Sequence, residues 1–391
     1  MKRLTNFLIF FLFALEINTQ VIKVDINPTS QPKGSLMLSD VVGQVEYIPL
    51  ETKNNCIVGN INYFDVSENY IAVYVYQTEE IFLFRRTGRF VTKIGRYGQG
   101  GTEYIELRGI FINELKKCVY VQDSRKLLMY DLSGKHLNTF SYNERISWIY
   151  AHYNNQFISG NISIRTNEDY FVYGIWDSNM KLLKQAVKGV PVELRGNRSS
   201  HVGIPISCYI YQGFPHLKES VLNDTIYLLN KNNEFIPKYI INCGRYGATL
   251  EMKGDAENFS KNQNNGRIIG GMCFFETPNF LLASYQYIDK WIPCYFDKKA
   301  NKLLYFNSDE GIPDDYTGGI DFVFVSSFIN AKQKNNELYS FLNAYDLLKI
   351  YDKQKKLTPK GPAASVQKVQ SLLKNLDPED NPVLIIAKIK E

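Results

Sequence analysis

Two stretches of the chain decide the fold: IFLFRRTGRFVTKI at residues 81–94 and LLMYDLSGKHLNTF at residues 127–140. They align without a gap, and Gly88 falls on Gly134 at an offset of 46 residues (134 minus 88). In each stretch an apolar strand leads through a tight turn into another strand, and glycine suits a turn that needs a positive φ. A repeat of this length is typical of the blades of a β-propeller, which have roughly 40 to 50 residues.

Weaker copies of this unit follow along the chain. A polar turn after an apolar strand recurs at 177–181, 230–234 and 297–302, and a further strand at 320–330 opens a sixth unit. The uneven spacing of the copies suits blades that carry insertions of variable length. We therefore predict an all-β fold, a six-bladed β-propeller whose blades are four-stranded antiparallel sheets.

The last part of the chain differs from the other units. Residues 345–357 and 365–376 carry apolar residues at spacings of three and four, which predicts a short helical insertion in the last blade. Strands are expected near both ends of the mature chain, at 45–51 and 381–390. Because an unpaired edge would leave a seam in the ring, we expect these strands to share a blade and to close a single domain over residues 21–391.

The N-terminus has the pattern of a secretory signal peptide. Lys2 and Arg3 precede an apolar run from Leu4 to Leu15, shorter than the roughly 20 residues that span a bilayer. We assign residues 1–20 to this peptide and leave its cleavage site open. No other segment is apolar enough to cross a membrane. The sequence thus predicts an exported protein, periplasmic or extracellular, that is soluble once the peptide is removed.

Composition excludes several classes of protein. Hydrophobic residues make up 45% of the 391 residues, which is enough for a large core. A formal net charge of +5, spread along the chain, is too small for a nucleic-acid surface. A zinc site is not expected, because there is no CxxC pair and the four histidines are scattered. We favour free thiols over disulfides for the cysteines in apolar runs, which are Cys118, Cys208, Cys273 and Cys294.

Several segments together carry a family resemblance: VEYIPLET at 45–52, IGRYGQGGTEY at 94–104, DSRKLLMYDLSGK at 123–135, LNDTIYLL at 222–229 and DNPVLIIAKIK at 380–390. They resemble six-bladed β-propeller proteins, related to NHL repeats, that Gram-negative anaerobic bacteria export. The resemblance extends over essentially the whole mature chain. It implies a propeller fold and export, and it implies no established activity.

Long polar insertions mark the face on which a ligand is expected. They lie at 191–205, 247–267 and 307–319, and all three connect one expected blade to the next. In a propeller these connections share a face with the loops between second and third strands, where ligands usually meet the channel. The ligand-binding candidates on this face are Gln77, Asp123, Arg125, Arg195, Arg198, His201, Asn223, Arg267, Asp314, Asp315 and Tyr316.

Two kinds of function fit these loops. We expect an exported, non-catalytic binding protein that recognises a carbohydrate, a peptide or an envelope protein on the insertion-bearing face. The alternative is a metal-dependent propeller enzyme of the lactonase or glycan-cleaving type. No catalytic residue is assigned and no cofactor is predicted, although Asp314 and Asp315 leave calcium open as a metal. A purely structural adaptor also stays open.

Overall fold

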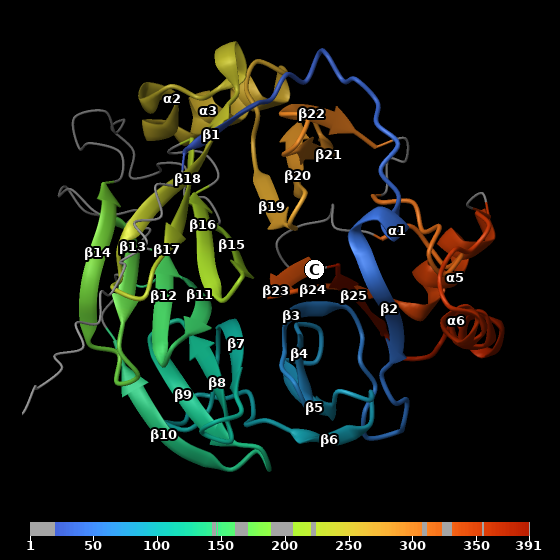
Figure 1. Ribbon diagram of the computed structural model, residues 1–391. Coiled ribbons are helices and arrows are strands. Elements are labelled where there is room, and N and C mark those ends of the chain that lie inside the picture. The colour runs from blue at the N-terminus through green and yellow to red at the C-terminus, as the bar shows by residue number, and fades with distance from the viewer. Residues whose placement is uncertain are drawn as a thin grey trace, which may run out of the picture.

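Antiparallel sheets arranged around a central channel make up the fold (Figure 1). The computed structural model describes residues 20–142, 146, 148–160, 171–188, 206–219, 224–306, 311–322, 331–353 and 356–390. Within them, no helix is long and apolar enough to cross a membrane.

Four of the sheets are separate four-stranded antiparallel meanders, as predicted for the blades. In chain order they contain β3 (Ile61–Val66), β4 (Tyr70–Val75), β5 (Glu80–Arg85) and β6 (Phe90–Lys93); β7 (Leu107–Asn113), β8 (Cys118–Asp123), β9 (Lys126–Asp131) and β10 (His136–Ser141); β11 (Trp148–Tyr153), β12 (Gln156–Gly160), β13 (Phe171–Trp176) and β14 (Leu182–Lys188); and β19 (Met272–Glu276), β20 (Phe280–Tyr287), β21 (Lys290–Asp297) and β22 (Lys302–Tyr305).

The other strands form one nine-stranded sheet in the order β1-β18-β17-β16-β15-β23-β24-β25-β2. Its two halves meet through a single parallel residue pair, Ile210 with Lys334. The count of six blades therefore stays a prediction. The strands are β1 (Ile22–Asp25), β2 (Val42–Pro49), β15 (Ile206–Tyr211), β16 (Phe214–Glu219), β17 (Thr225–Leu229), β18 (Phe235–Asn242), β23 (Ala331–Lys334), β24 (Glu337–Leu342) and β25 (Val383–Ile389).

The repeated turn has the predicted conformation. Gly88 and Gly134 have φ of 86° and 89°. A Cβ atom at Gly88 would lie 2.1 Å from the carbonyl oxygen of Pro49, so both the backbone angle and the space require glycine. In the weaker copies Met180, Asn233 and Asn301 have φ of 63°, 60° and 50°, so the chain makes the same turn at some cost in strain.

Apolar faces of neighbouring sheets pack against each other to form the core. Between the sheets that start with β3 and β7, for example, Tyr74 and Leu83 of one sheet pack with Ile110, Val119 and Leu128 of the other. Each fully buried aliphatic side chain of this kind contributes about 1.5 to 3 kcal/mol. This packing of apolar side chains between neighbouring sheets thus holds the sheets around the channel.

The N-terminal arm contacts β18, β22 and β25, and of these contacts the ones with β18 and β22 were not predicted from the sequence. β1 pairs in parallel with β18. The arm then passes β22, where Gly34 N–H donates to the Tyr305 carbonyl at 2.9 Å, and enters helix α1 (Leu38–Val41) and β2 (Figure 1). β2 pairs antiparallel with β25 from Val42 to Pro49.

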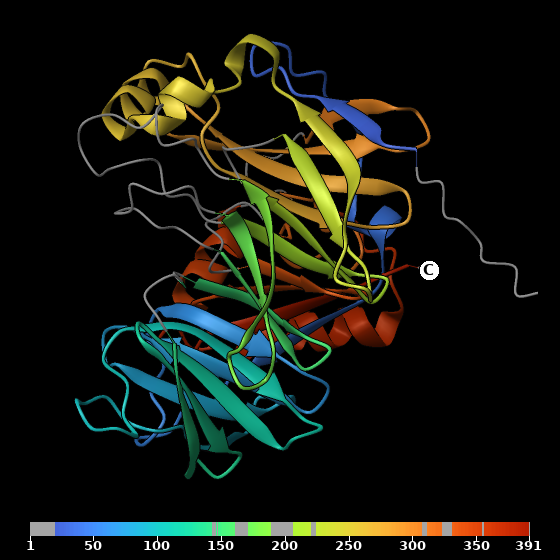
Figure 2. The same ribbon diagram turned by 90° about the vertical axis from the view of Figure 1, so that its left-hand side faces the viewer.

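Helices occur at two places outside the sheets. The predicted pair is confirmed as α5 (Ala344–Lys353) and α6 (Ala363–Asn375), between β24 and β25. The expectation of a polar loop at 247–267 is wrong in part, because α2 (Leu250–Gly254) and α3 (Ala256–Asn264) form there, after a short 3-10 helix, η2 (Gly244–Tyr246). The Asp255 carboxylate caps α3 by accepting from two backbone N–H groups at 3.0 and 3.1 Å. Figure 2 shows α2 and α3 on the side of the ring opposite the C-terminus.

Two further predictions concern single segments. All six cysteines are free, including the four in apolar runs for which free thiols were favoured. Most of the strand predicted at 320–330, residues 323–330, falls outside the described residues. Its first three residues, Ile320–Phe322, form no strand, and the next strand begins at Ala331.

Candidate functional site

A cavity of about 370 Å³ lies in the central channel. Its walls are residues of β3, β7, β11, β15, β19 and β23, the first strand of each sheet or half-sheet, with Tyr339 of β24. Arg108 and Trp148 line it where these strands begin, and His152 and Lys334 line it where they end. The cavity therefore extends along the channel, and a volume of this size accommodates a small organic ligand.

Cationic side chains outnumber anionic ones among the described residues of this lining. Arg108, Lys332 and Lys334 are cations, and Asp65 is the one carboxylate. Asp65 is already engaged, because one of its oxygens accepts from the Ile112 N–H at 2.8 Å and the other lies 3.7 Å from Lys334 Nζ. This carboxylate joins β3 to β7 and balances Lys334.

Arg108 and Trp148 form an aromatic and cationic pair at one end of the cavity. The guanidinium carbon of Arg108 lies 5.5 Å from the centre of the Trp148 ring. Arg108 Nη2 also donates to Glu106 at 2.9 Å, but the Glu106 side chain is 61% exposed, so water screens this pair. An aromatic ring beside a planar cation suits polar, ring-containing ligands.

Lys332 is the cation with the least compensation in the wall. Its ammonium donates to the Phe64 carbonyl and lies 4.8 Å from the centre of the Phe64 ring. Within the described part of the chain, no carboxylate forms an ion pair with it. Burial lowers the pKa of Lys332, and the Asp65 carboxylate opposes this shift.

His152 brings an unused polar atom to the cavity. Its ring packs 4.8 Å from that of Phe157, and its Nε2 is buried without a hydrogen-bond partner among the described residues. Burial lowers the pKa of His152 to about 4, so the ring is neutral at pH 7. A buried polar atom of this kind favours a ligand or a water molecule that can pair with it.

Polar side chains fasten the wall strands to one another. Gln122 Oε1 accepts from Ile149 N–H at 2.7 Å, and Ser207 Oγ accepts from Phe274 N–H at 3.1 Å. Gln333 exchanges two hydrogen bonds of 2.6 Å with the backbone of Glu276. These contacts hold the wall in place before any ligand arrives, which lowers the entropic cost of binding.

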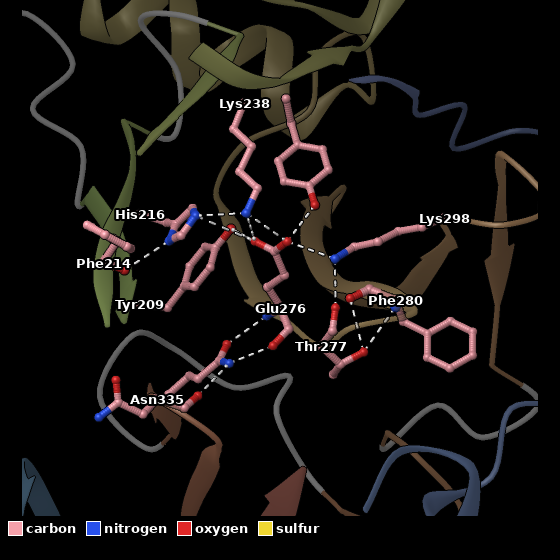
Figure 3. Close-up of polar contacts among 11 residues, drawn as sticks. Tyr209, Phe214, His216, Lys238, Glu276, Thr277, Phe280, Lys298 and Asn335 are labelled. Carbon is pink, nitrogen blue, oxygen red and sulfur yellow. Dashed lines mark hydrogen bonds and ion pairs between the residues drawn. The ribbon is translucent and has the colours of Figure 1, made fainter. Parts of the chain in front are cut away.

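A second polar cluster surrounds the side chain of Glu276, at the end of β19 (Figure 3). Its carboxylate is 1% exposed. Oε1 accepts from Lys298 Nζ and Tyr239 OH, both at 2.7 Å, and Oε2 accepts from Tyr209 OH and Lys238 Nζ, both at 3.2 Å. Burial alone would raise the pKa of Glu276, but the two lysines outweigh it and hold the pKa at about 2.

The partners of Glu276 are themselves paired. Lys298 Nζ also donates to the Thr277 carbonyl at 2.6 Å, and Lys238 Nζ lies 3.1 Å from His216 Nε2. Burial and the Lys238 charge lower the pKa of His216 to about 4, so its neutral ring accepts from Lys238. The carboxylate and both ammonium groups thus have partners within the cluster, which leaves few hydrogen-bonding groups for a ligand. The cluster instead joins β16, β18, β19 and the β21–β22 turn.

No predicted binding residue within the described part of the chain lies at the cavity. Gln77, Arg125 and Arg267 are exposed in loops. Asp123 is buried, and its carboxylate accepts from the Ile105 N–H at 2.7 Å. None of these side chains lines the described cavity. The candidates outside the described residues are Arg195, Arg198, His201 and Asn223.

Asp314, Asp315 and Tyr316 are buried and fasten a loop to the N-terminal arm. The Asp314 carboxylate accepts from the backbone N–H groups of Tyr316 and Thr317 at 2.9 and 2.8 Å, and burial raises its pKa. The Asp315 carboxylate accepts from Ser39 Oγ at 2.6 Å and Lys360 Nζ at 2.7 Å, and Tyr316 OH donates to the backbone of the arm. These contacts account for the two carboxylates, and the described residues contain no group of three or more metal-ligating side chains.

Sequence reasoning missed the residues that line the cavity. The available signal was the alternation of large polar or aromatic residues along innermost strands, as in Trp148, Tyr150 and His152, or Lys332 and Lys334. Alternation alone does not say which face of a strand meets the channel.

The chain belongs to the DUF4934 family, a domain of unknown function, whose family model matches residues 19–388. No curated protein matches the chain.

Two solved structures are similar in fold. One, from Bacteroides fragilis, is of a protein that is proposed to be exported; it has a TM-score of 0.69 at 16% identity and covers 95% of this chain and 100% of its own. The other is a member of the DUF4221 family from Bacteroides vulgatus, with a TM-score of 0.48 at 10% identity, covering 92% of this chain and 99% of its own. At these identities the likeness concerns the fold.

Proposed function

We propose that the protein is an exported, non-catalytic binding protein that takes a carbohydrate or peptide ligand, free or on an envelope protein, at the loop-bearing face of its central channel. The observation that supports this most is the cavity of about 370 Å³, with aromatic and cationic side chains in its wall. Aromatic faces and fixed polar groups are what binding sites for polar ring-containing ligands use.

The proposal includes a ring of six blades. In it, β15 to β18 form one blade, with β1 added at its edge, and β23 to β25 form another with β2. The single pair Ile210–Lys334 would then be a contact between two blades rather than the middle of a sheet. The pairing of β2 with β25 supports a single domain over residues 21–391 that is closed by both ends of the chain.

Export is proposed from the N-terminal sequence, where two basic residues precede a short apolar run. The similar protein from Bacteroides fragilis is also proposed to be exported. The proposed location is the periplasm or the cell exterior.

The enzyme alternative gains no support from the described residues. A hydrolase of this kind needs an acid–base pair or a metal held by several carboxylates or histidines. Asp65 is the one carboxylate in the described lining, and both of its oxygens have partners. The wall therefore offers binding groups rather than a pair of catalytic carboxylates.

A thermal-shift screen of the purified protein against envelope glycans, sugar acids and short peptides tests this function. A ligand that binds the native state raises the melting temperature, by an amount that increases with the ratio of its concentration to its Kd. We expect at least one of these classes to do so, and substitution of Trp148 by alanine to weaken the effect. Stabilisation by none of them, or turnover of a ligand into product, would contradict the proposal.

A further inference from the structure

We propose that Lys332 pairs with a carboxylate group of the ligand in the central cavity, so that the ligand is an organic acid of small size. This inference rests on the proposed binding function and specifies the chemistry of its ligand. The observation behind it is a cation in the cavity wall that forms no ion pair with a carboxylate of the described residues.

The surroundings of Lys332 make its charge costly in the ligand-free protein. An ammonium group has three N–H donors, and Lys332 uses one of them on the Phe64 carbonyl. A buried cation costs several kcal/mol of desolvation unless an anion and further hydrogen bonds compensate it. The chain compensates other partly buried lysines, because Lys238 and Lys298 share Glu276, and Lys334 lies beside Asp65. A ligand carboxylate would supply what Lys332 lacks.

The rest of the wall fits an organic anion better than a bare inorganic one. Trp148 and Tyr150 line the cavity with aromatic side chains, and these can bury the apolar face of a ligand. His152 lines the same cavity, and its Nε2, which has no hydrogen-bond partner among the described residues, can bond to a polar group of the ligand.

Charge complementarity over the whole wall points the same way. Asp65 and Lys334 balance each other, and Arg108 is paired with an exposed carboxylate. Lys332 is the one of these three cations that has no carboxylate partner among the described residues. A ligand with a single carboxylate would neutralise it in a setting of low dielectric, where such a hydrogen bond is short and strong.

The experiment compares matched ligands on matched variants. Glucuronate and glucose have the same sugar ring with and without a carboxylate, while glutamate has carboxylates without the sugar ring. Each is titrated by calorimetry and by thermal shift into the wild type, Lys332→Gln and Lys332→Met. The control is Lys368→Gln, which removes the same charge from an exposed site on α6.

The expected result has three parts. Glucuronate or glutamate binds the wild type and the Lys368→Gln control with the same affinity, and glucose binds neither of these two proteins. Both Lys332 variants bind the carboxylate ligand about 30-fold or more weakly than the wild type does. Glucuronate and glutamate distinguish a sugar acid from an amino acid or peptide as the source of the carboxylate. In addition, the ligand-free Lys332→Met protein melts at or above the temperature of the wild type, since the substitution removes an uncompensated charge.

Three outcomes overturn the inference. If glucose binds as tightly as glucuronate, and Lys332→Gln does not change either affinity, the protein is a binding protein but Lys332 does not pair with a ligand carboxylate. If none of the acids binds the wild type while a neutral glycan or peptide does, the proposed binding function is supported and the proposed carboxylate ligand is again excluded. If Lys332→Met and Lys332→Gln both lower the melting temperature sharply, Lys332 is a structural link to the Phe64 carbonyl. Failure of every ligand, by contrast, removes the proposed function itself.

Discussion

Replacing Glu276 by glutamine should destabilise the protein strongly, although the side chain keeps its size. The wild-type carboxylate is 1% exposed and lies 2.7 Å from Lys298 Nζ and 3.0 Å from Lys238 Nζ. In Glu276→Gln both ammonium groups stay buried without a counter-charge, and the amide NH₂ faces donors instead of accepting from them. Removing one partner of a buried ion pair costs about 3 to 5 kcal/mol.

This loss can be expressed as a change in melting temperature. With an unfolding entropy of about 2 cal/mol/K per residue, the 391-residue chain has a total of about 0.8 kcal/mol/K. A loss of about 3 to 5 kcal/mol therefore lowers the melting temperature by about 4 to 6 °C. Calorimetry or circular dichroism at pH 7 measures the shift.

Two controls separate this effect from a general loss of charge. Glu80→Gln removes the partner of Lys93 in a pair whose side chains are 42% and 34% exposed, and it should cost less than about 1 kcal/mol. In the double variant Glu276→Gln with Lys298→Met, one of the two unpaired charges is gone, so part of the loss should be recovered. A shift below about 1 °C for Glu276→Gln, or no coupling in the double variant, would refute this account of the cluster.

Three further predictions concern the stability of the ring. Burial and Lys238 lower the pKa of His216 to about 4, whereas the pKa in the unfolded chain is 6.5. The free energy of unfolding should therefore fall by up to about 3 kcal/mol as the pH decreases from 6.5 toward 4. Urea unfolding at several pH values measures this loss, and a free energy that does not change with pH would contradict it. Asp315→Asn weakens the bonds to Ser39 and Lys360, which should cost about 1.5 to 3 kcal/mol and speed proteolysis of the N-terminal arm; unchanged cleavage would argue against this role. Deletion of the residues after Asp380 removes β25 and exposes the edges of β2 and β24, so cooperative melting should disappear; a truncated protein that melts sharply near the parent temperature would exclude closure by the chain ends.

Local sequence patterns predicted the parts of the fold that depend on neighbours in the chain. Gly88 and Gly134 identified the repeated turn because a positive φ leaves few alternatives to glycine. The helices α5 and α6 were predictable because their apolar residues follow the helical period. In contrast, α2 and α3 are short and polar, and their start depends on capping by Thr249 and Asp255.

The features that the sequence did not predict depend on contacts between distant segments. The pairing of β1 with β18 uses backbone hydrogen bonds, which leave no pattern in the side chains. Glu276, Lys238 and Lys298 come from different strands and turns, and each reads as an ordinary charged residue in its own segment. The same holds for Lys332, whose significance arises because no carboxylate of the described residues forms an ion pair with it in the folded wall.

The candidate site shows this limit most clearly. Asp314 and Asp315 stood out in the sequence as adjacent carboxylates in a glycine-flanked loop, and both turned out to be buried partners of backbone N–H groups, a serine and a lysine. Buried carboxylates that are fully hydrogen-bonded stabilise loops as readily as they bind ligands. A sequence gives the residue types of a loop, whereas exposure and pairing decide which of these roles they take.

The most direct test of the central claim is a crystal structure of the protein with the ligand that stabilises it best in the thermal-shift screen. The account predicts ligand density inside the central channel, beside Trp148, with an acidic group within hydrogen-bonding distance of Lys332. Density on the outer edge of the sheets, with the channel wall unchanged and filled by water alone, would contradict it.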